Sequence, residues 1–283
     1  MEIDFTKMHT NGSDYIYIDC FHNNIDIELV RKNIKHLCDR NFGIGGNGLI
    51  LILPSDKAQA KVIVYNKNGS ETAISGNGLC AVAKYLYENK LVLEESFEIE
   101  ATTKIYKVNL KTNENEVENV TINIGHPNFI PKKIPVITDK SFFINEKITV
   151  NDENYRITCL SIDNPHAVIF TKYIYNLKIH NIGPIIESYH LFPQKINVDF
   201  VEIINKNNIK LKIWERDSGE TLSCGTGACA AVVAGIINNK LNKHIPINVI
   251  QDGGTSKVEY TEDGIILTTK TDNIYRGKVL IKN

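Results

Sequence analysis

Two stretches of the chain align without a gap and decide the fold: residues 61–80 read KVIVYNKNGSETAISGNGLC, and residues 210–229 read KLKIWERDSGETLSCGTGAC. The offset between them is 149 (224 − 75), and six of the aligned positions are identical. After a one-residue insertion the match continues, and both copies end in Asn-Lys-Leu, at 89–91 and 239–241. A match of this length favours an internal duplication over chance, and a duplication predicts two lobes of similar fold.

Both copies show the same local pattern. A β-branched and aromatic run, at 62–65 and 211–214, predicts a strand, and a polar loop follows it. Gly-X-Gly then opens an alanine-rich apolar stretch that predicts a buried helix, at about 77–89 and 226–238. The sequence also predicts strands at 15–19, 49–53, 97–101, 167–170 and 198–204, and a surface helix at 28–39. We therefore expect an α+β protein of two pseudo-symmetric lobes, each a curved, mostly antiparallel sheet wrapped around a central helix.

Length and composition agree with this organisation. A chain of 283 residues suits two domains, and 42% hydrophobic with 23% charged residues are globular values. We expect one lobe from residues 1–127 plus 272–283 and the other from 128–271, with the active site in the cleft between them. The net charge of −1 gives no electrostatic reason to expect nucleic acid or a membrane surface as a partner.

The cysteine count and the absence of long apolar runs bear on location. Residues 1–7 carry two acids and lack the apolar run of a signal peptide, and no stretch reaches the length of a membrane span. Six cysteines in such a chain are best interpreted as reduced thiols. We expect a cytoplasmic protein.

Ser75 and Cys224 occupy equivalent positions, each directly before the first glycine of its Gly-X-Gly loop. At a helix N-terminus the unpaired N–H groups and the helix dipole favour an anion, and they lower the pKa of a cysteine thiol. Glycines at 76, 78, 225 and 227 leave no side chain to keep a ligand from the backbone.

A pseudo-twofold site with one proton-transfer group on each side suits inversion of an amino acid's α-carbon. One group removes the α-proton from one face, and the other delivers a proton to the opposite face. Helix N-termini would stabilise the negative charge that develops on the carboxylate. The alternative for Cys224 alone is a buried structural thiol, and the repeat argues against it.

Other motifs are weaker. Residues 43–48 match GxGxxG but stand after a helix and before a strand, and residues 76–81 lie too far from their strand for a dinucleotide-binding turn. Cys224 and Cys229 lack a second ligand pair at zinc spacing, so we predict no metal site. His166 is placed in a turn, where a structural and a functional role are equally compatible with the sequence.

These residues resemble the bacterial diaminopimelate epimerase family essentially from end to end. The resemblance is carried by Lys7-Met8-His9, Phe42-Gly43-Ile44-Gly45, Asn66-x-x-Gly69-Ser70-Glu71, Gly76-Asn77-Gly78, Asn164-Pro165-His166, Asn197, Glu215-Arg216, Gly219-Glu220-Thr221 and Cys224-Gly225-Thr226-Gly227-Ala228-Cys229. It implies two pseudo-symmetric lobes. It also implies epimerisation that uses neither pyridoxal phosphate nor any other cofactor. The implied partner is a small diamino diacid with two amino-acid ends, and a homodimer is a further expectation.

The resemblance also implies residue roles. Cys224 matches one catalytic cysteine, and His166 and Glu215 are implicated near the reacting amine. The carboxylate at the reacting centre would be bound by Gly76, Asn77, Gly225 and Thr226. The distal amino-acid end would be read by Asn66, Asn164, Asn197, Arg216 and the main chain at Glu215. An arginine fork suits a carboxylate, and amide oxygens suit an ammonium group.

The sequence departs from the family at several positions. Ser75 stands where the second catalytic cysteine belongs, and a hydroxyl is a far poorer base than a thiol unless another group takes its proton. We favour an engineered Cys→Ser form, with substrate binding kept and most turnover lost, over a natural variant with altered activity. Ser13 replaces the usual asparagine at a substrate-binding position, Asn47 an aspartate, and Cys80-Ala81 an Arg-Cys pair. These departures leave open a related racemase or epimerase acting on lanthionine or histidine, or a non-catalytic amino-acid-binding homologue.

Overall fold

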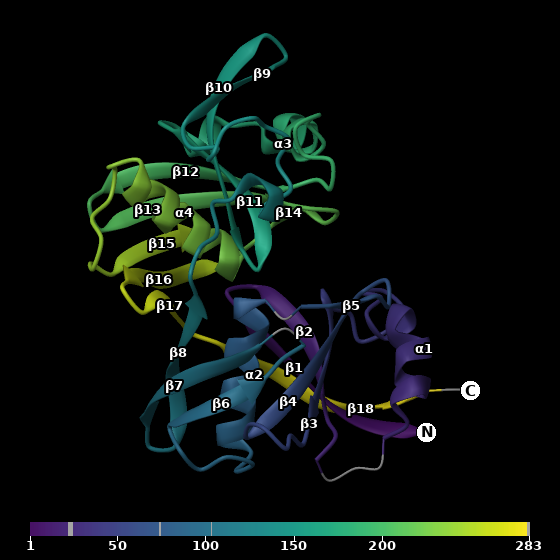
Figure 1. Ribbon diagram of the computed structural model, residues 1–283. Coiled ribbons are helices and arrows are strands. Elements are labelled where there is room, and N and C mark those ends of the chain that lie inside the picture. The colour runs from purple at the N-terminus through teal and green to yellow at the C-terminus, as the bar shows by residue number, and fades with distance from the viewer. Residues whose placement is uncertain (22–24, 74, 103, 282–283) are drawn as a thin grey trace. The chain divides into compact units, whose positions relative to one another are not determined.

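The computed structural model describes residues 1–21, 25–73, 75–102 and 104–281, which form two compact units (Figure 1). Unit 1 comprises Met1–Ile122 and Thr269–Asn283, and unit 2 comprises Asn123–Thr268. The chain passes from unit 1 to unit 2 within strand β8 (Glu116–Gly125) and returns at the end of strand β17 (Gly264–Thr269). Both borders lie a few residues before those expected from the sequence.

The main sheet of unit 1 contains eight strands in the order β18-β1-β2-β3-β4-β6-β7-β8. All neighbours are antiparallel except β2–β3 and β4–β6, and the short β5 pairs with β4. The strand bounds are β1 (Glu2–Thr10), β2 (Ser13–Asp19), β3 (Gly48–Leu53), β4 (Ala60–Asn66), β5 (Glu71–Thr72), β6 (Ser96–Glu100), β7 (Ile105–Asn113) and β18 (Asp272–Leu280). The helices are α1 (Ile27–Leu37) and α2 (Gly76–Glu88).

Unit 2 has the same strand order, β9-β10-β11-β12-β13-β15-β16-β17. Its two parallel neighbours, β11–β12 and β13–β15, occupy the same places as those of unit 1, and the short β14 pairs with β13 as β5 does with β4. The bounds are β9 (Glu146–Val150), β10 (Glu153–Ile162), β11 (Asn164–Thr171), β12 (Asn197–Asn205), β13 (Asn208–Glu215), β14 (Gly219–Thr221), β15 (Ile247–Gln251) and β16 (Gly254–Thr261). The helices are α3 (Ile179–Glu187), α4 (Gly225–Ile237) and two 3-10 turns, η1 (Pro131–Lys133) and η2 (Ile174–Asn176). The identical strand order supports the duplication inferred from the repeat.

Each unit surrounds one helix. In α2 every residue from Gly76 to Leu86 is buried, and in α4 every residue from Gly225 to Gly235. Small and apolar residues around α4 allow such burial, and in α2 the buried Lys84 is paired with Glu88 and donates to the carbonyl of Val117. The α+β fold class is confirmed, and both helices begin and end one residue before their predicted limits. Within the described residues, no helix combines the length and apolar character needed to span a bilayer.

The predicted strands are present, but the expected turn at Asn164-Pro165-His166 is wrong. Asn164 begins β11, and His166 lies inside that strand opposite Leu160 of β10. The turn is made one residue earlier, at Asp163, whose φ of 63° lies in the left-handed region that aspartate tolerates. His166 is fully buried as a result.

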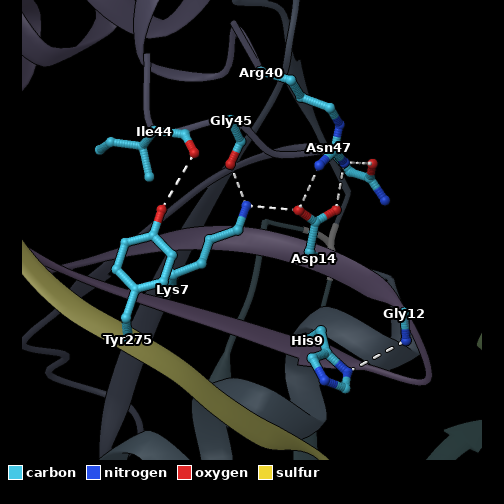
Figure 2. A network of polar contacts seen from close by, with 9 residues as sticks. All are labelled: Lys7, His9, Gly12, Asp14, Arg40, Ile44, Gly45, Asn47 and Tyr275. Atoms are coloured by element: carbon cyan, nitrogen blue, oxygen red, sulfur yellow. Dashed lines mark hydrogen bonds and ion pairs between the residues drawn. The ribbon is translucent and has the colours of Figure 1, made fainter.

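A buried network of charges ties the start of β2 to the loop between α1 and β3 (Figure 2). Asp14 contacts Lys7 Nζ at 2.7 Å and receives two hydrogen bonds from Arg40, at 3.0 and 2.7 Å. Lys7 also donates to the carbonyl of Gly45, and Arg40 donates to Asn47 Oδ1 at 3.1 Å. Asn47 thus contributes an amide oxygen where the sequence comparison expects a carboxylate.

Burial and charge contacts have opposing effects on the pKa values of Asp14 and Lys7. Burial by itself would raise the pKa of Asp14, but hydrogen bonds from Arg40 and Lys7 and their charges hold it below its usual value. Burial lowers the pKa of Lys7, and its contact with Asp14 opposes that fall.

Candidate active site

Ser75 is the N-cap of α2. Its backbone is extended (φ −76°, ψ 154°), and its Oγ accepts a hydrogen bond from the N–H of Gly78 at 3.1 Å. Serine is among the preferred N-cap residues because its oxygen satisfies a backbone donor that the helix leaves open. The Ser75 hydroxyl therefore caps the N-terminus of α2.

The predicted residues of unit 1 outside α2, Ser13 and Asn66, lie at strand ends. Ser13 follows the β1–β2 turn, and Thr10, on the other side of the turn, donates its hydroxyl hydrogen to the carbonyl of Asn77 at 2.9 Å. This bond holds the hairpin against the first turn of α2. Asn66 ends β4, is exposed, and donates to Ser70 Oγ at 3.1 Å.

Cys224 is the N-cap of α4, the position equivalent to Ser75, but its side chain does not cap the helix. Its backbone N–H donates to Gln251 Oε1 at 2.8 Å, and its Sγ lies 3.4 Å from Thr226 Oγ1. The side chain is buried, with 6% of the residue exposed. Gln251 therefore anchors the backbone of this cysteine, and Thr226 touches its thiol.

The lowered pKa expected for this thiol is wrong for the structure as it stands. Burial raises the pKa of Cys224 well above its usual value, and the negative charge of Glu215 raises it further. Contacts with Thr226 and the N–H of Gly227 oppose the rise but do not cancel it. Burial likewise raises the pKa of Glu215, against hydrogen bonds from the Thr221 hydroxyl (2.5 Å) and the Cys224 thiol. At neutral pH Cys224 is a protonated thiol.

The raised pKa of Cys224 predicts slow alkylation. We expect iodoacetamide to label Cys224 poorly at pH 7–8 and faster as the pH rises, because only the thiolate reacts. Glu215→Gln removes the neighbouring negative charge and should increase the neutral-pH rate, whereas Glu220→Gln removes a carboxylate that pairs with Lys212 and His180 and should change it little. Peptide mass spectrometry measures the label at each cysteine. Equal rates in the two variants would contradict the assigned role of Glu215.

His166 contacts side chains on both sides of its ring. Its Nδ1 lies 2.7 Å from Asp199 Oδ2, and its Nε2 lies 3.0 Å from Asn164 Oδ1 and 3.2 Å from Thr226 Oγ1. Asp199 is 0% exposed, and burial raises its pKa while His166 opposes the rise. The sequence-predicted His166, Asn164, Thr226 and Cys224 thus form one connected group.

Asn197 joins the two segments that carry the remaining predicted residues of unit 2. Its Nδ2 donates to the carbonyl of Pro165 at 2.8 Å, and its Oδ1 accepts from the backbone N–H of Arg216 at 2.8 Å. The guanidinium of Arg216 donates to the carbonyl of Gln194 at 3.4 Å. The structure therefore gives Asn197 a part in holding the backbone on either side of it.

Glu187, which the sequence analysis missed, supports the same loop. Its Oε1 accepts from the N–H of Asp217 at 2.9 Å, and its Oε2 accepts from Trp214 Nε1 at 2.7 Å. Lys195 Nζ lies 3.4 Å from the same carboxylate. Trp214 and Asp217 flank Glu215 and Arg216, so Glu187 fixes the course of the backbone that carries Glu215 and Arg216.

Asp199 and Gln251 were also missed. Asp199 stands in the predicted strand 198–204 between Val198 and Phe200, and a carboxylate with apolar residues on both sides is the signal that could have identified it. Gln251 and Glu187 carry no such signal, because they reach the site from segments distant in sequence.

Packing within unit 2 explains why residue 227 is glycine, whereas the sequence analysis attributed the glycine to access for a ligand. A Cβ at this position would lie 2.7 Å from Ile213 Cδ1 and 2.9 Å from Asp199 Oδ1. The missing side chain lets Asp199 reach the first turn of α4, so the unit's own core, without any ligand, already requires glycine here.

Comparisons with known proteins bear on the family of the chain. The sequence model of diaminopimelate epimerase matches residues 5–130 and 158–275. The diaminopimelate epimerase of Brachyspira hyodysenteriae is 40% identical over 281 residues, covering 99% of this chain and 100% of that protein. The diaminopimelate epimerase of Acetivibrio thermocellus is 35% identical over 277 residues, covering 97% of this chain and 98% of that protein.

A solved structure extends the likeness to the fold. The hydroxyproline epimerase of Agrobacterium vitis superposes with a TM-score of 0.73 at 13% identity, covering 98% of this chain and 92% of that one. At this identity the match speaks for the fold alone. The sequence matches, in contrast, span nearly the whole chain, and the chain belongs to the diaminopimelate epimerase family.

Proposed function

We propose that this protein is an amino-acid epimerase of the isomerase class whose reaction is the interconversion of LL- and meso-2,6-diaminopimelate, in lysine and peptidoglycan precursor biosynthesis. The observation that carries the proposal is the placement of Ser75 and Cys224 as N-caps of equivalent helices in two units of identical strand order. The names of the full-length relatives support the substrate.

The proposed chemistry uses two bases and no cofactor. One group, as a thiolate, takes the α-proton from one face of the carbon, and the other, as a thiol, delivers a proton to the opposite face. Cys224 supplies one group, and position 75 supplies the other when it is cysteine. Because Cys224 is held protonated, it is poised as the donor before substrate binds.

The remaining predicted residues bind the substrate. The backbone N–H groups of the first turns of α2 and α4, at Gly76-Asn77 and Gly225-Thr226, bind the reacting carboxylate and stabilise the charge that develops on it. Ser13 joins this set from the neighbouring hairpin, and His166 and Glu215 act near the reacting amine. The distal end is read by Asn66, Asn164, Asn197 and Arg216.

Isotope exchange tests the assignment. LL-diaminopimelate is incubated in D₂O with this protein and with its Ser75→Cys variant, and deuterium at the α-carbon is followed by NMR. Exchange by the variant supports the proposal. Exchange by neither protein, with both shown to be folded, would overturn it. Robust calorimetric binding without activity in the variant would favour the amino-acid-binding homologue instead.

Arg216→Ala separates a two-ended substrate from a one-ended one. We expect calorimetric affinity for diaminopimelate to fall about 100-fold, because truncation removes a charged fork that pairs with the distal carboxylate and is worth about 2–3 kcal/mol. An exposed cation of the same unit, in Arg156→Ala, is the matched control and should bind normally. Unchanged affinity in Arg216→Ala would favour a one-ended amino acid such as histidine. Tighter binding of lanthionine than of diaminopimelate would favour the thioether substrate.

The proposal includes a cellular location for the enzyme. A biosynthetic reaction of this kind belongs in the cytoplasm, and all six cysteines are free, as thiols in a reducing compartment are. We also propose a homodimer.

A further inference from the structure

A chain of contacts leads from a fully buried carboxylate to the Cys224 thiol. Asp199 Oδ2 lies 2.7 Å from His166 Nδ1, His166 Nε2 lies 3.2 Å from Thr226 Oγ1, and Thr226 Oγ1 lies 3.4 Å from Cys224 Sγ. All four residues belong to unit 2: His166 lies in β11, Asp199 in β12 and Thr226 in α4, and Cys224 is the N-cap of α4. The connection therefore rests on the packing of a single unit.

The sheet register sets the two ends of the His166–Asp199 contact. In the parallel pair β11–β12, His166 stands opposite Asn197, and Asp199 stands opposite Val168. Alternate residues of a strand share a face, so the imidazole and the carboxylate project from the same face of the sheet. Both are 0% exposed, so water has no access to either.

Asp199 has few other interactions. Its second oxygen, Oδ1, has no hydrogen-bond partner among the described residues. That oxygen approaches the first turn of α4 at Gly227, where the positive end of the helix dipole favours a carboxylate. A buried carboxylate without a cation of its own is costly, and its direct polar contact here is His166 Nδ1.

We propose that Asp199 is a positioning residue for the proton transfer: it fixes a proton on His166 Nδ1, so that Nε2 is the nitrogen presented to Thr226 and, through Thr226, to Cys224. This inference deepens the proposed function and rests on it. A carboxylate that accepts from one ring nitrogen selects the imidazole tautomer and fixes the ring's orientation, as in the Ser-His-Asp arrangement of hydrolases.

Around His166, Asp199 approaches from β12, Thr226 and Cys224 from α4, Glu215 from β13, and Asn164 from its own strand. With the proton on Nδ1, Nε2 is an acceptor, so Asn164 must present its amide NH₂ there in place of the Oδ1 that lies 3.0 Å from Nε2. Thr226 can donate its hydroxyl hydrogen to one neighbour while accepting from another, so it can relay a proton between Nε2 and the thiol. Asp199 is the group that faces Nδ1.

The direct test is the protonation pattern of His166 by ¹⁵N NMR of histidine-labelled protein, with His166→Gln used to identify its signal among the eight histidines. We expect a protonated Nδ1 throughout the pH range 6–9. In the near-isosteric Asp199→Asn the amide can donate to Nδ1, and the pattern should move toward a protonated Nε2. Glu202→Gln, which removes another carboxylate of β12 that accepts a hydrogen bond from the N–H of Ile174, is the matched control and should leave the His166 signals in place.

A kinetic arm separates positioning from folding. In the Ser75→Cys background we expect Asp199→Asn to lower kcat about 10–100-fold with KM little changed, which is the usual cost of losing a group that orients a reacting side chain. A native His166 with an unprotonated Nδ1, an unchanged spectrum in Asp199→Asn, or an unchanged kcat overturns the inference. The NMR arm needs no turnover, so it decides on Asp199 even where the exchange experiment contradicts the proposed function.

Discussion

Restoring cysteine at position 75 is expected to raise α-proton exchange on diaminopimelate by about 10²–10⁴-fold, the range that one well-placed acid or base supplies. The serine hydroxyl ionises far above neutral pH, and its oxygen already accepts the hydrogen bond from the Gly78 N–H. A thiol at the same place ionises several pH units lower and accepts hydrogen bonds weakly. Deuterium incorporation in D₂O measures the rate.

Ser75→Ala is the control for this prediction. It removes the hydroxyl without supplying a thiol, so exchange should be no faster than with Ser75. It also removes the N-cap, and the free energy of unfolding should fall by about 1 kcal/mol. Exchange by Ser75→Cys at the Ser75 rate, with unfolding showing an intact fold, would contradict the two-base mechanism.

Asp14→Asn is expected to lower the free energy of unfolding by about 3–5 kcal/mol, because it leaves the buried Lys7 ammonium without its counterion. Lys7 is 4% exposed and cannot turn to water, whereas the Arg40 side chain is exposed enough to recover hydration. Urea denaturation at pH 7 measures the loss. Glu2→Gln, which breaks an exposed pair with Lys278, is the matched control and should cost less than about 1 kcal/mol.

The stability that Asp14 contributes depends on pH. Its folded-state pKa lies below its unfolded value, so the contribution is fully present above the unfolded pKa and is lost as the pH falls through the folded pKa. We therefore expect the difference in unfolding free energy between Asp14→Asn and the parent to narrow below about pH 4. A difference that stays constant down to pH 2 would show that Asp14 acts by packing alone.

Much of the fold was predictable because the sequence contains an internal repeat. The repeat at 61–80 and 210–229 indicated two equivalent lobes, and apolar runs located β3, β4, β12 and the two buried helices. Strands such as β7 were not predicted, because their apolar residues alternate with polar ones and form no continuous apolar run. Their pairing is set by distant partners, and one sequence does not display those.

The site was predictable in its parts and less so in its electrostatics. The motifs located Cys224, His166 and Arg216, and a helix N-terminus at Cys224 led to the expectation of a lowered thiol pKa. In the structure the pKa of this thiol is raised instead, because burial and the charge of Glu215 outweigh the hydrogen bonds from Thr226 and the N–H of Gly227. The depth of a side chain follows from how several strands pack, and neither spacing nor composition reports it. Glu187 escaped for the same reason.

The pairing of the first strand with the last has a consequence for synthesis on the ribosome. Unit 2 is one continuous segment, Asn123–Thr268, whereas β1 of unit 1 lies between β2 and β18. While the nascent chain is still emerging, the N-terminal half therefore exposes an open strand edge until residues 272–280 have been made. The later-encoded half can mature first, reversing the usual N-to-C order, and the unfinished half is the part that a chaperone would need to shield.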